Sequence, residues 1–264
     1  MKEELFLLLT YFLIYSILGW VMESVFRSVM EKRIINTGFL KGPICPIYGF
    51  GAIIMITILK NLENNIILLF IISLIILTIW EYIVGVLLEK IFHTKYWDYS
   101  DHKINFQGRI CLSNSIYWGI LGVVFVKFIH PFIQRIVGNT DINILYFVVT
   151  ISSLVFMVDV ITSVIKVKNI QSALRKIEEL NNQIKEKLKE IKTEKTTEKL
   201  DITENIQKIV NDLNEKRNRI IIRLYRNVYR LKKAFPAIDT KEIREILNKK
   251  IELKGIIKNK ENKN

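Results

Sequence analysis

Long apolar runs fill the chain as far as Ile165, separated by short clusters of polar, glycine and proline positions. A helix needs about 20 mostly apolar residues to cross the hydrocarbon core of a bilayer. The pattern predicts about five spans, at Leu5–Val29, Ile44–Leu59, Ile66–Phe92, Leu112–Phe132 and Ile142–Ile165. The second is short and begins PICPIYGFGA, so a partly re-entrant segment shielded by protein is the alternative.

After Lys166 the apolar positions thin to a stripe with alternating spacings of three and four, which is typical of a coiled coil. A polar stretch between Lys192 and Leu200 interrupts this stripe. The tail has two possible arrangements: two antiparallel helices of one chain, or a long rod that pairs with a second chain. We predict an all-α protein with a transmembrane helix bundle over residues 1–165 and a helical, coiled-coil tail over residues 166–264.

The formal net charge of +13 is unevenly distributed along the chain. Residues 1–165 hold 12 Lys and Arg against 11 Asp and Glu, which leaves 27 against 15, or +12, for residues 166–264. Loops rich in Lys and Arg remain preferentially cytoplasmic. Because these residues concentrate in the first loop, the third loop and the tail, we expect a multi-pass plasma-membrane protein with a cytoplasmic tail and an external N-terminus.

The most basic part of the tail runs from Lys216 to Lys233, where eight Lys and Arg side chains are set among apolar ones. Beneath a membrane, such a helix can lie on anionic lipid headgroups, with a solvated helix face as the alternative. Membrane tethering and the lack of a recognisable DNA-binding motif argue against nucleic acid. The expected partners are therefore the lipid bilayer and anionic headgroups.

Two parts of the apolar region resemble each other. The sequences GWVMESVF and GPIC, which begin at Gly19 and Gly42, recur from Gly85 and Gly108 as GVLLEKIF and GRIC. Each copy carries a glutamate, Glu23 or Glu89, within an apolar run, and six of 27 aligned positions are identical. Transporter folds are often built from weak repeats, so a parallel repeat of two helical hairpins stands beside chance similarity.

An ionisable side chain is costly in hydrocarbon, so carboxylates inside the spans are candidates for a functional site. Glu23 and Glu81 fall about 27 and 22 Å along their spans, in the expected cytoplasmic halves, and Glu89 and Asp159 lie near the same surface. A glycine one turn from each glutamate allows close approach of another helix. An ion pair between Glu23 and Arg27, or a snorkelling role for Glu89, is the alternative. We expect these carboxylates to line a polar cavity that opens to the cytoplasm.

Two expected cytoplasmic loops are rich in Gly, Pro, aromatic and amide residues, from Gly38 to Ala52 and from Trp97 to Gly119. This composition is typical of an ordered loop that folds over a site, although single aromatic residues equally suit interfacial anchoring. Cys45 and Cys111 are expected to be unpaired thiols on the reducing side. Their spacing from the histidines gives no metal motif, and no cofactor is indicated.

These loops resemble the bacterial inner-membrane family called putative ABC-transporter type IV, or CmpB-type. The resemblance rests on GW-x-x-E from Gly19, GFLKGPICPIYGFGA, WEY from Trp80, and WDYS with NFQGRICLSNSIYWG, and RLKKAFP from Arg230 is similar to the family's tail ending. The resemblance implies a transporter permease, and its pattern points also to Pro43, Pro46, Gly49 and Gly108. With the carboxylates, the expected site residues are Tyr48, Trp97, Asp98, Tyr99, Asn105, Arg109 and Ser113.

No nucleotide-binding motif G-x-x-x-x-G-K-[ST] occurs, so ATP-driven transport would need a separate ATPase subunit. Five spans are few for a complete permease, which favours a homodimer. An enzyme acting on a lipid or lipid-linked headgroup is one alternative, with Asp98 or Glu23 as base and Arg109 holding a phosphate. A membrane-anchored coiled-coil scaffold or sensor is another. Because no catalytic constellation is visible, an enzyme is the less favoured interpretation.

Overall fold

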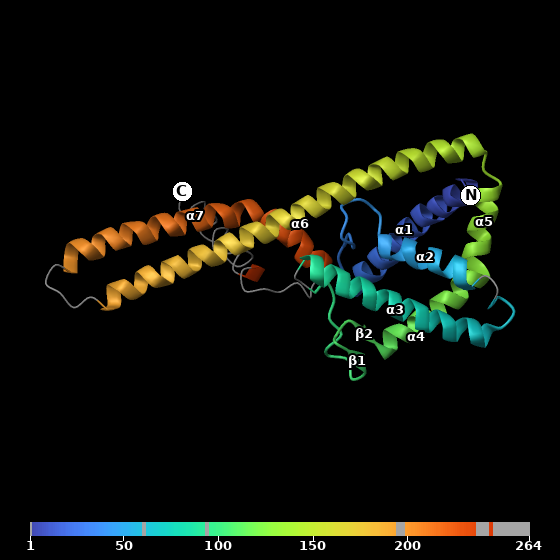
Figure 1. Ribbon diagram of the computed structural model, residues 1–264, viewed down its shortest axis with the longest axis horizontal. Helices are drawn as coiled ribbons and strands as arrows, with labels where there is room; N and C mark the ends of the chain where they lie inside the picture. Colours follow the sequence, from blue (N-terminus) through green and yellow to red (C-terminus); the bar gives the residue numbers. More distant parts are fainter. Residues whose placement is uncertain (1, 60–61, 93–94, 194–198, 236–242, 245–264) are drawn as a thin grey trace. The chain divides into compact units, whose positions relative to one another are not determined.

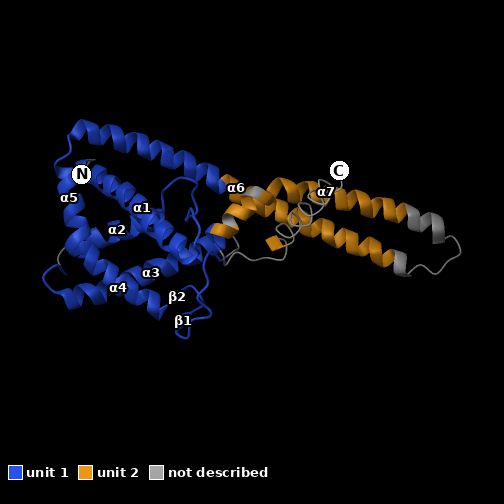
Figure 2. Cartoon of the chain, turned by 180° about the vertical axis from the view of Figure 1, so that it is seen from behind, with its two compact units in different colours: residues 1–164, 234–238 blue, residues 165–233, 239–264 orange. Residues whose placement is uncertain are grey.

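The computed structural model describes residues 2–59, 62–92, 95–193, 199–235 and 243–244. The chain divides into two compact units (Figure 2), one comprising residues 1–164 and 234–238, the other residues 165–233 and 239–264. The elements in order are α1 (Lys2–Met30), α2 (Pro46–Leu59), α3 (Ile66–Phe92), β1 (Asn105–Phe106), β2 (Ile110–Cys111), α4 (Leu112–Val124), α5 (His130–Gly138), α6 (Ile142–Thr193) and α7 (Lys199–Ala234), as labelled in Figure 1. The expected all-α class is confirmed.

Within the described part of the chain, four helices are long and apolar enough to cross a membrane: Glu3–Met30, Ile66–Ile91, Leu112–Gly138 and Ile142–Glu190. They correspond to four of the five predicted runs, although the last two extend further than expected. The remaining run forms α2, which has 14 residues. At 1.5 Å per residue α2 is about 21 Å long, less than the hydrocarbon thickness of about 30 Å.

The first loop, Glu31–Cys45, explains why α2 is short, because it folds back along α1. The N–H of Cys45 donates to the carbonyl of Ser16 at 2.9 Å, although Ser16 lies about 21 Å before the end of α1 along the helix axis. The hydroxyl of Ser28 accepts from the N–H of Ile35 at 2.9 Å. Non-helical backbone at membrane depth requires such protein partners.

Glycines allow the helices to approach closely. A Cβ atom on Gly19 would lie 2.3 Å from the Cβ of Tyr48, so α1 and α2 can meet there only without a side chain. A Cβ on Gly122 of α4 would likewise lie 2.3 Å from the Cβ of Ser73 on α3. The expected close helix approach is therefore found at Gly19. Gly85, by contrast, faces side chains of the third loop, residues 93–111, rather than another helix.

The third loop contains the short β1–β2 hairpin, with Asn105 opposite Cys111. Its turn places Gln107 and Gly108 at φ values of 56° and 68°, the left-handed region in which glycine is favoured. A Cβ on Gly108 would lie 2.2 Å from a carboxylate oxygen of Asp98. The glycine therefore allows the hairpin turn to close directly over the start of the loop.

The apolar core of the first unit lies between α1, α2, α3 and the π-helical turn Phe125–Ile129 that joins α4 to α5. This turn precedes Pro131, which has no N–H for the regular helical bond. The hydroxyl of Tyr15 in α1 lies 2.8 Å from Nδ1 of His130, linking α1 to this helix junction. The buried members of the core are Tyr11, Tyr15, Ala52, Met55, Leu59, Leu69, Leu77, Phe125, Val126 and Val137.

In the second unit the later part of α6 and α7 form an antiparallel hairpin within one chain (Figure 2). Ile184 of α6 packs with Ile206 and Val210 of α7, and Nη1 of Arg217 donates to the side-chain oxygen of Asn181 at 2.9 Å. Of the two arrangements left open by the apolar stripe, this unit therefore has the hairpin.

Candidate functional site

Glu81 is a buried carboxylate of α3, with only 4% of its surface exposed. Its Oε1 accepts hydrogen bonds from Nδ2 of Asn114 at 2.7 Å and from the hydroxyl of Tyr99 at 3.1 Å. Its Oε2 accepts from Nε1 of Trp118 at 2.9 Å. Amide and indole N–H groups can only donate, so both oxygens act as acceptors, as they do in an ionised carboxylate.

Glu23 of α1 lies near the beginning of α2. The thiol of Cys45 donates to its Oε2 at 3.8 Å, and the side chain of Tyr48 lies near this carboxylate. The guanidinium of Arg27 instead pairs with Glu31 at 2.9 Å. The alternative of a close Glu23–Arg27 ion pair is not found, because the guanidinium is directed toward Glu31, although its positive charge still acts on Glu23 at longer range.

In the described part of the chain, neither Glu23 nor Glu81 forms an ion pair with Lys, Arg or His. Their hydrogen-bond partners are neutral donors from the first loop, the third loop and α4. Neutral donors stabilise a carboxylate without cancelling its charge. The positive charge of Arg27 acts on Glu23 from beyond ion-pair distance, whereas Glu81 has only neutral partners among the described residues. Both glutamates can therefore attract a positive group.

Both carboxylates line one pocket of about 570 Å³ in the first unit. Its other charged lining residues are Arg27 and Asp98. The ring of Phe235 closes against that of Tyr96, with centroids 4.6 Å apart, and the preceding carbonyl of Ala234 accepts from Arg27. The aromatic lining residues are Phe39, Tyr48, Phe50, Trp80, Tyr96, Trp97, Tyr99, Trp118 and Phe235.

Six of the expected site residues line this pocket and five do not. Those in the lining are Glu23, Tyr48, Glu81, Trp97, Asp98 and Tyr99. Those outside the lining are Glu89, Asn105, Arg109, Ser113 and Asp159. The structure thus brings together only part of the set that the sequence suggested.

Glu89 and Arg109 are partners of each other. Nη2 and Nε of Arg109 donate to Oε2 of Glu89 at 2.6 and 3.0 Å, and the guanidinium carbon lies 5.8 Å from the ring centre of Tyr82. Nε1 of Trp97 donates to the carbonyl of Arg109 at 2.8 Å. These contacts attach the third loop to α3 and explain why Glu89 does not point into the pocket.

Asp159 of α6 holds the first loop rather than lining the pocket. Its carboxylate accepts from the N–H of Gly42 at 2.7 Å and of Lys41 at 3.2 Å. The hydroxyl of Ser163 donates to it at 3.2 Å. The expectation that Asp159 shares a recess with Glu23 and Glu81 is not met, because loop amides occupy its oxygens.

Asn105 and Ser113 also serve the loop. The side-chain oxygen of Asn105 accepts from the N–H of Gly108 at 3.0 Å, and its amide donates to the carbonyl of His102 at 2.7 Å. Ser113 lies 3.3 Å from the thiol of Cys111, at the start of α4. Both residues therefore stabilise the third loop. The same loop carries Tyr99, which donates a hydrogen bond to Glu81.

Local surroundings shift the protonation of two groups of the third loop. Burial, and then the nearby Glu81, raise the pKa of Tyr99, which keeps its hydroxyl as a donor. Hydrogen bonds from Ser100 hold the pKa of Asp98 below its usual value, so Asp98 is a poor base.

The sequence reasoning selected Ser113 from the beginning of α4, whereas Asn114 and Trp118 are the residues that bind Glu81. Their spacing of four was a usable signal, because it places both on one face of a helix. Phe235 offered no such signal beyond its place in RLKKAFP. Its contribution follows from a contact between segments far apart in the chain.

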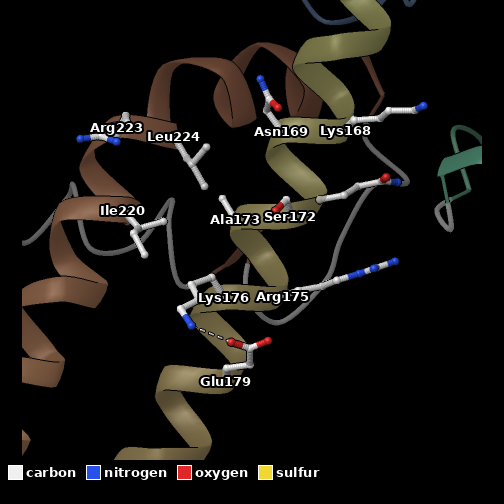
Figure 3. Close-up of a pocket in the computed structure, with 11 residues that line it drawn as sticks. Lys168, Asn169, Ser172, Ala173, Arg175, Lys176, Glu179, Ile220, Arg223 and Leu224 are labelled. Carbon is white, nitrogen blue, oxygen red and sulfur yellow. Dashed lines mark hydrogen bonds and ion pairs between the residues drawn. The ribbon is translucent and has the colours of Figure 1, made fainter.

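A second pocket lies between α6 and α7 in the other unit (Figure 3). Ala173, Ile220 and Leu224 face the space between the helices, while Lys168 and Arg175 point away from it. Lys176 pairs with Glu179 at 2.9 Å. This pocket therefore offers no convergent set of polar groups. Among the described residues, no three His, Cys, Asp or Glu side chains are arranged to hold a metal ion.

The four long apolar helices indicate a membrane protein, and the pocket lies in the unit that they form. Residues 10–164 match the family described as putative ABC-transporter type IV, and the chain belongs to this family. The family resemblance noted from the loop motifs is thus confirmed. No curated protein and no solved structure matches the chain.

Proposed function

We propose that the protein is a permease-type component of a transporter, with a solute-binding site in the pocket lined by Glu23 and Glu81. The observation that carries this proposal is the pair of carboxylates from separate apolar helices, held by neutral donors in one pocket. Intramembrane carboxylates are costly and commonly mark substrate or ion pathways. Tyr48, Trp97, Asp98 and Tyr99 complete the proposed site.

The proposed topology follows the distribution of Lys and Arg, with the N-terminus outside, the tail in the cytoplasm and the pocket opening to the cytoplasm. The protein would lie in the plasma membrane as a homodimer and use a separate ATPase subunit, because the chain itself lacks an ATP-binding motif. The basic segment Lys216–Lys233 would attract anionic headgroups. Ile221, Leu224 and Val228 are buried, whereas Ile222 and Tyr229 are exposed, so this attraction would act through charge with these two side chains available to the headgroup region.

Asp98 and Arg109 supply little support for the alternative of a lipid-headgroup enzyme. Asp98 has a lowered pKa, and Arg109 is already held by Glu89. A base and a phosphate clamp need groups that are available to the substrate. Transport needs a binding site that is exposed alternately to the two sides of the membrane but no reacting group, which suits the pocket better.

The test compares low-molecular-mass solutes in cells and medium by mass spectrometry, without presuming a substrate. Cells would produce the wild type, Glu23→Gln, Glu81→Gln or no protein, and Glu63→Gln in the exposed α2–α3 connection serves as the charge-matched control. We expect at least one solute to be redistributed by the wild type and the control but not by the pocket variants. Equal profiles at equal membrane abundance for wild type and pocket variants would reject the proposal.

A further inference from the structure

We infer that the ligand of this pocket is an organic cation with an apolar body, such as a substituted amine or a quaternary ammonium or phosphonium group. This inference rests on the proposed function for the location of the site and adds the chemical class of its occupant. It is carried by the combination of two carboxylates that form no ion pair in the described part of the chain and aromatic walls in one pocket.

The charges in the lining favour a positive ligand. Glu23 and Glu81 are acidic and form no ion pair in the described part of the chain, whereas Asp98 pairs with Lys95 at 3.7 Å. Arg27, the one basic residue among the described lining residues, is held by Glu31 and by the carbonyl of Ala234. A negative ligand would meet these carboxylates without a guanidinium available to bind it. Like charges brought together in a region of low dielectric are strongly unfavourable.

The walls favour a ligand with apolar substituents. Nε1 of Trp80 donates to the carbonyl of Ile47 at 3.0 Å, and the indole N–H groups of Trp97 and Trp118 are also bound within the protein. The polar edges of these rings are thus occupied, which leaves their apolar surfaces for a ligand. Cations positioned over aromatic rings are attracted to them, and aromatic cages are well suited to quaternary ammonium groups.

The size and the available oxygens argue against a bare metal ion. Calcium takes six to eight oxygen ligands, and magnesium demands near-ideal octahedral geometry. Here the oxygens of Glu81 already accept three hydrogen bonds, and nearly half of the lining residues are aromatic. A volume of about 570 Å³ instead lies within the range of sites for small organic molecules.

The direct test uses two probes of nearly the same shape and opposite charge, tetraphenylphosphonium and tetraphenylborate. Binding of each to the full chain in lipid nanodiscs would be measured by equilibrium dialysis, with empty nanodiscs correcting for partition into lipid. We expect saturable binding of the cation only. Glu23→Gln should weaken it about tenfold or more, equivalent to about 1.4 kcal/mol, whereas Glu63→Gln should leave it unchanged.

A second variant tests the contribution of the aromatic wall separately from that of the carboxylates. Trp80→Leu keeps both carboxylates and should weaken the cation about fivefold or more, within the range of one cation–π contact. Saturable binding of tetraphenylborate, or equal affinity in Glu23→Gln and Glu63→Gln, would overturn the inference. Thermal melting of each variant in the same nanodiscs confirms that it is folded.

The two proposals fail in different ways. If solute profiles depend on Glu23 but the full chain binds no tetraphenylphosphonium, the ligand class is wrong and the transport role stands. If the cation binds as expected but solute profiles are the same with and without the pocket carboxylates, transport is rejected and the binding site stands.

Discussion

The hydrogen bonds of Glu81 allow a quantitative test of how the pocket is held together. The change Glu81→Leu removes the acceptor and leaves the indole N–H of Trp118 unpaired. The change Trp118→Phe leaves Oε2 of Glu81 without its donor. Each unpaired buried group costs about 1–3 kcal/mol, so each single variant should lose at least this much stability.

The double variant has neither unpaired group. It should therefore be more stable than the sum of the two single effects predicts. The two costs together give a coupling of about 2–6 kcal/mol. Because measured couplings between contacting residues reach about 3 kcal/mol, we expect about 2–3 kcal/mol.

The assay is equilibrium unfolding of the four proteins in mixed micelles. A matched cycle pairs Glu81→Leu with Trp20→Phe, since Trp20 donates to Asn36 in the first loop and makes no bond to Glu81. The two changes of this control should add to within about 0.5 kcal/mol. A coupling below that limit for the Glu81–Trp118 pair would refute the assigned hydrogen bond.

Three further experiments test other parts of the first unit. Gly19→Leu should separate α1 from α2 and abolish cooperative melting, whereas Gly138→Leu should change the melting temperature little, since nothing lies within 4 Å of its Cβ position. Because the pKa of Asp98 is lowered in the folded state, its contribution to stability is present above its unfolded pKa of about 3.9 and is lost as the pH falls further. Thermal melting between pH 7 and 3 should therefore show a smaller acid loss in Ser100→Ala than in the wild type, and equal losses would contradict the assignment. Because the free thiol of Cys45 is buried, with 5% of the residue exposed, maleimide should label it at least tenfold more slowly at pH 8 than in the denatured chain, as followed by mass spectrometry.

The positions of the long helices could be predicted because the length of an apolar run decides whether it spans a bilayer. The path of the first loop could not be predicted from the sequence. Its buried residues Ile35, Thr37 and Leu40 have no helical period, and Ile35 and Thr37 hydrogen-bond to serine side chains of α1. Only the unusual composition of the loop indicated that it is ordered.

Only part of the candidate site could be predicted from the sequence. Glu23 and Glu81 were evident because charge is rare in an apolar run. The depth of a residue along a span does not fix the direction of its side chain, and so Asp159 fell at the expected depth but binds loop amides. Glu89 had a partner in Arg109, near the other end of the third loop, which local spacing could not reveal.

Phe235 makes the pocket depend on a segment that lies far from the other lining residues in the chain. Phe235 packs on Tyr96 at the pocket wall, and the neighbouring carbonyl of Ala234 accepts from Arg27. A chain that ended at Lys233 would lack both contacts, and the wall would be incomplete beside Tyr96. By reciprocal linkage, a molecule that contacts Phe235 must stabilise the packing of this ring on Tyr96, and a substitution at Phe235 must change the affinity of the pocket for that molecule.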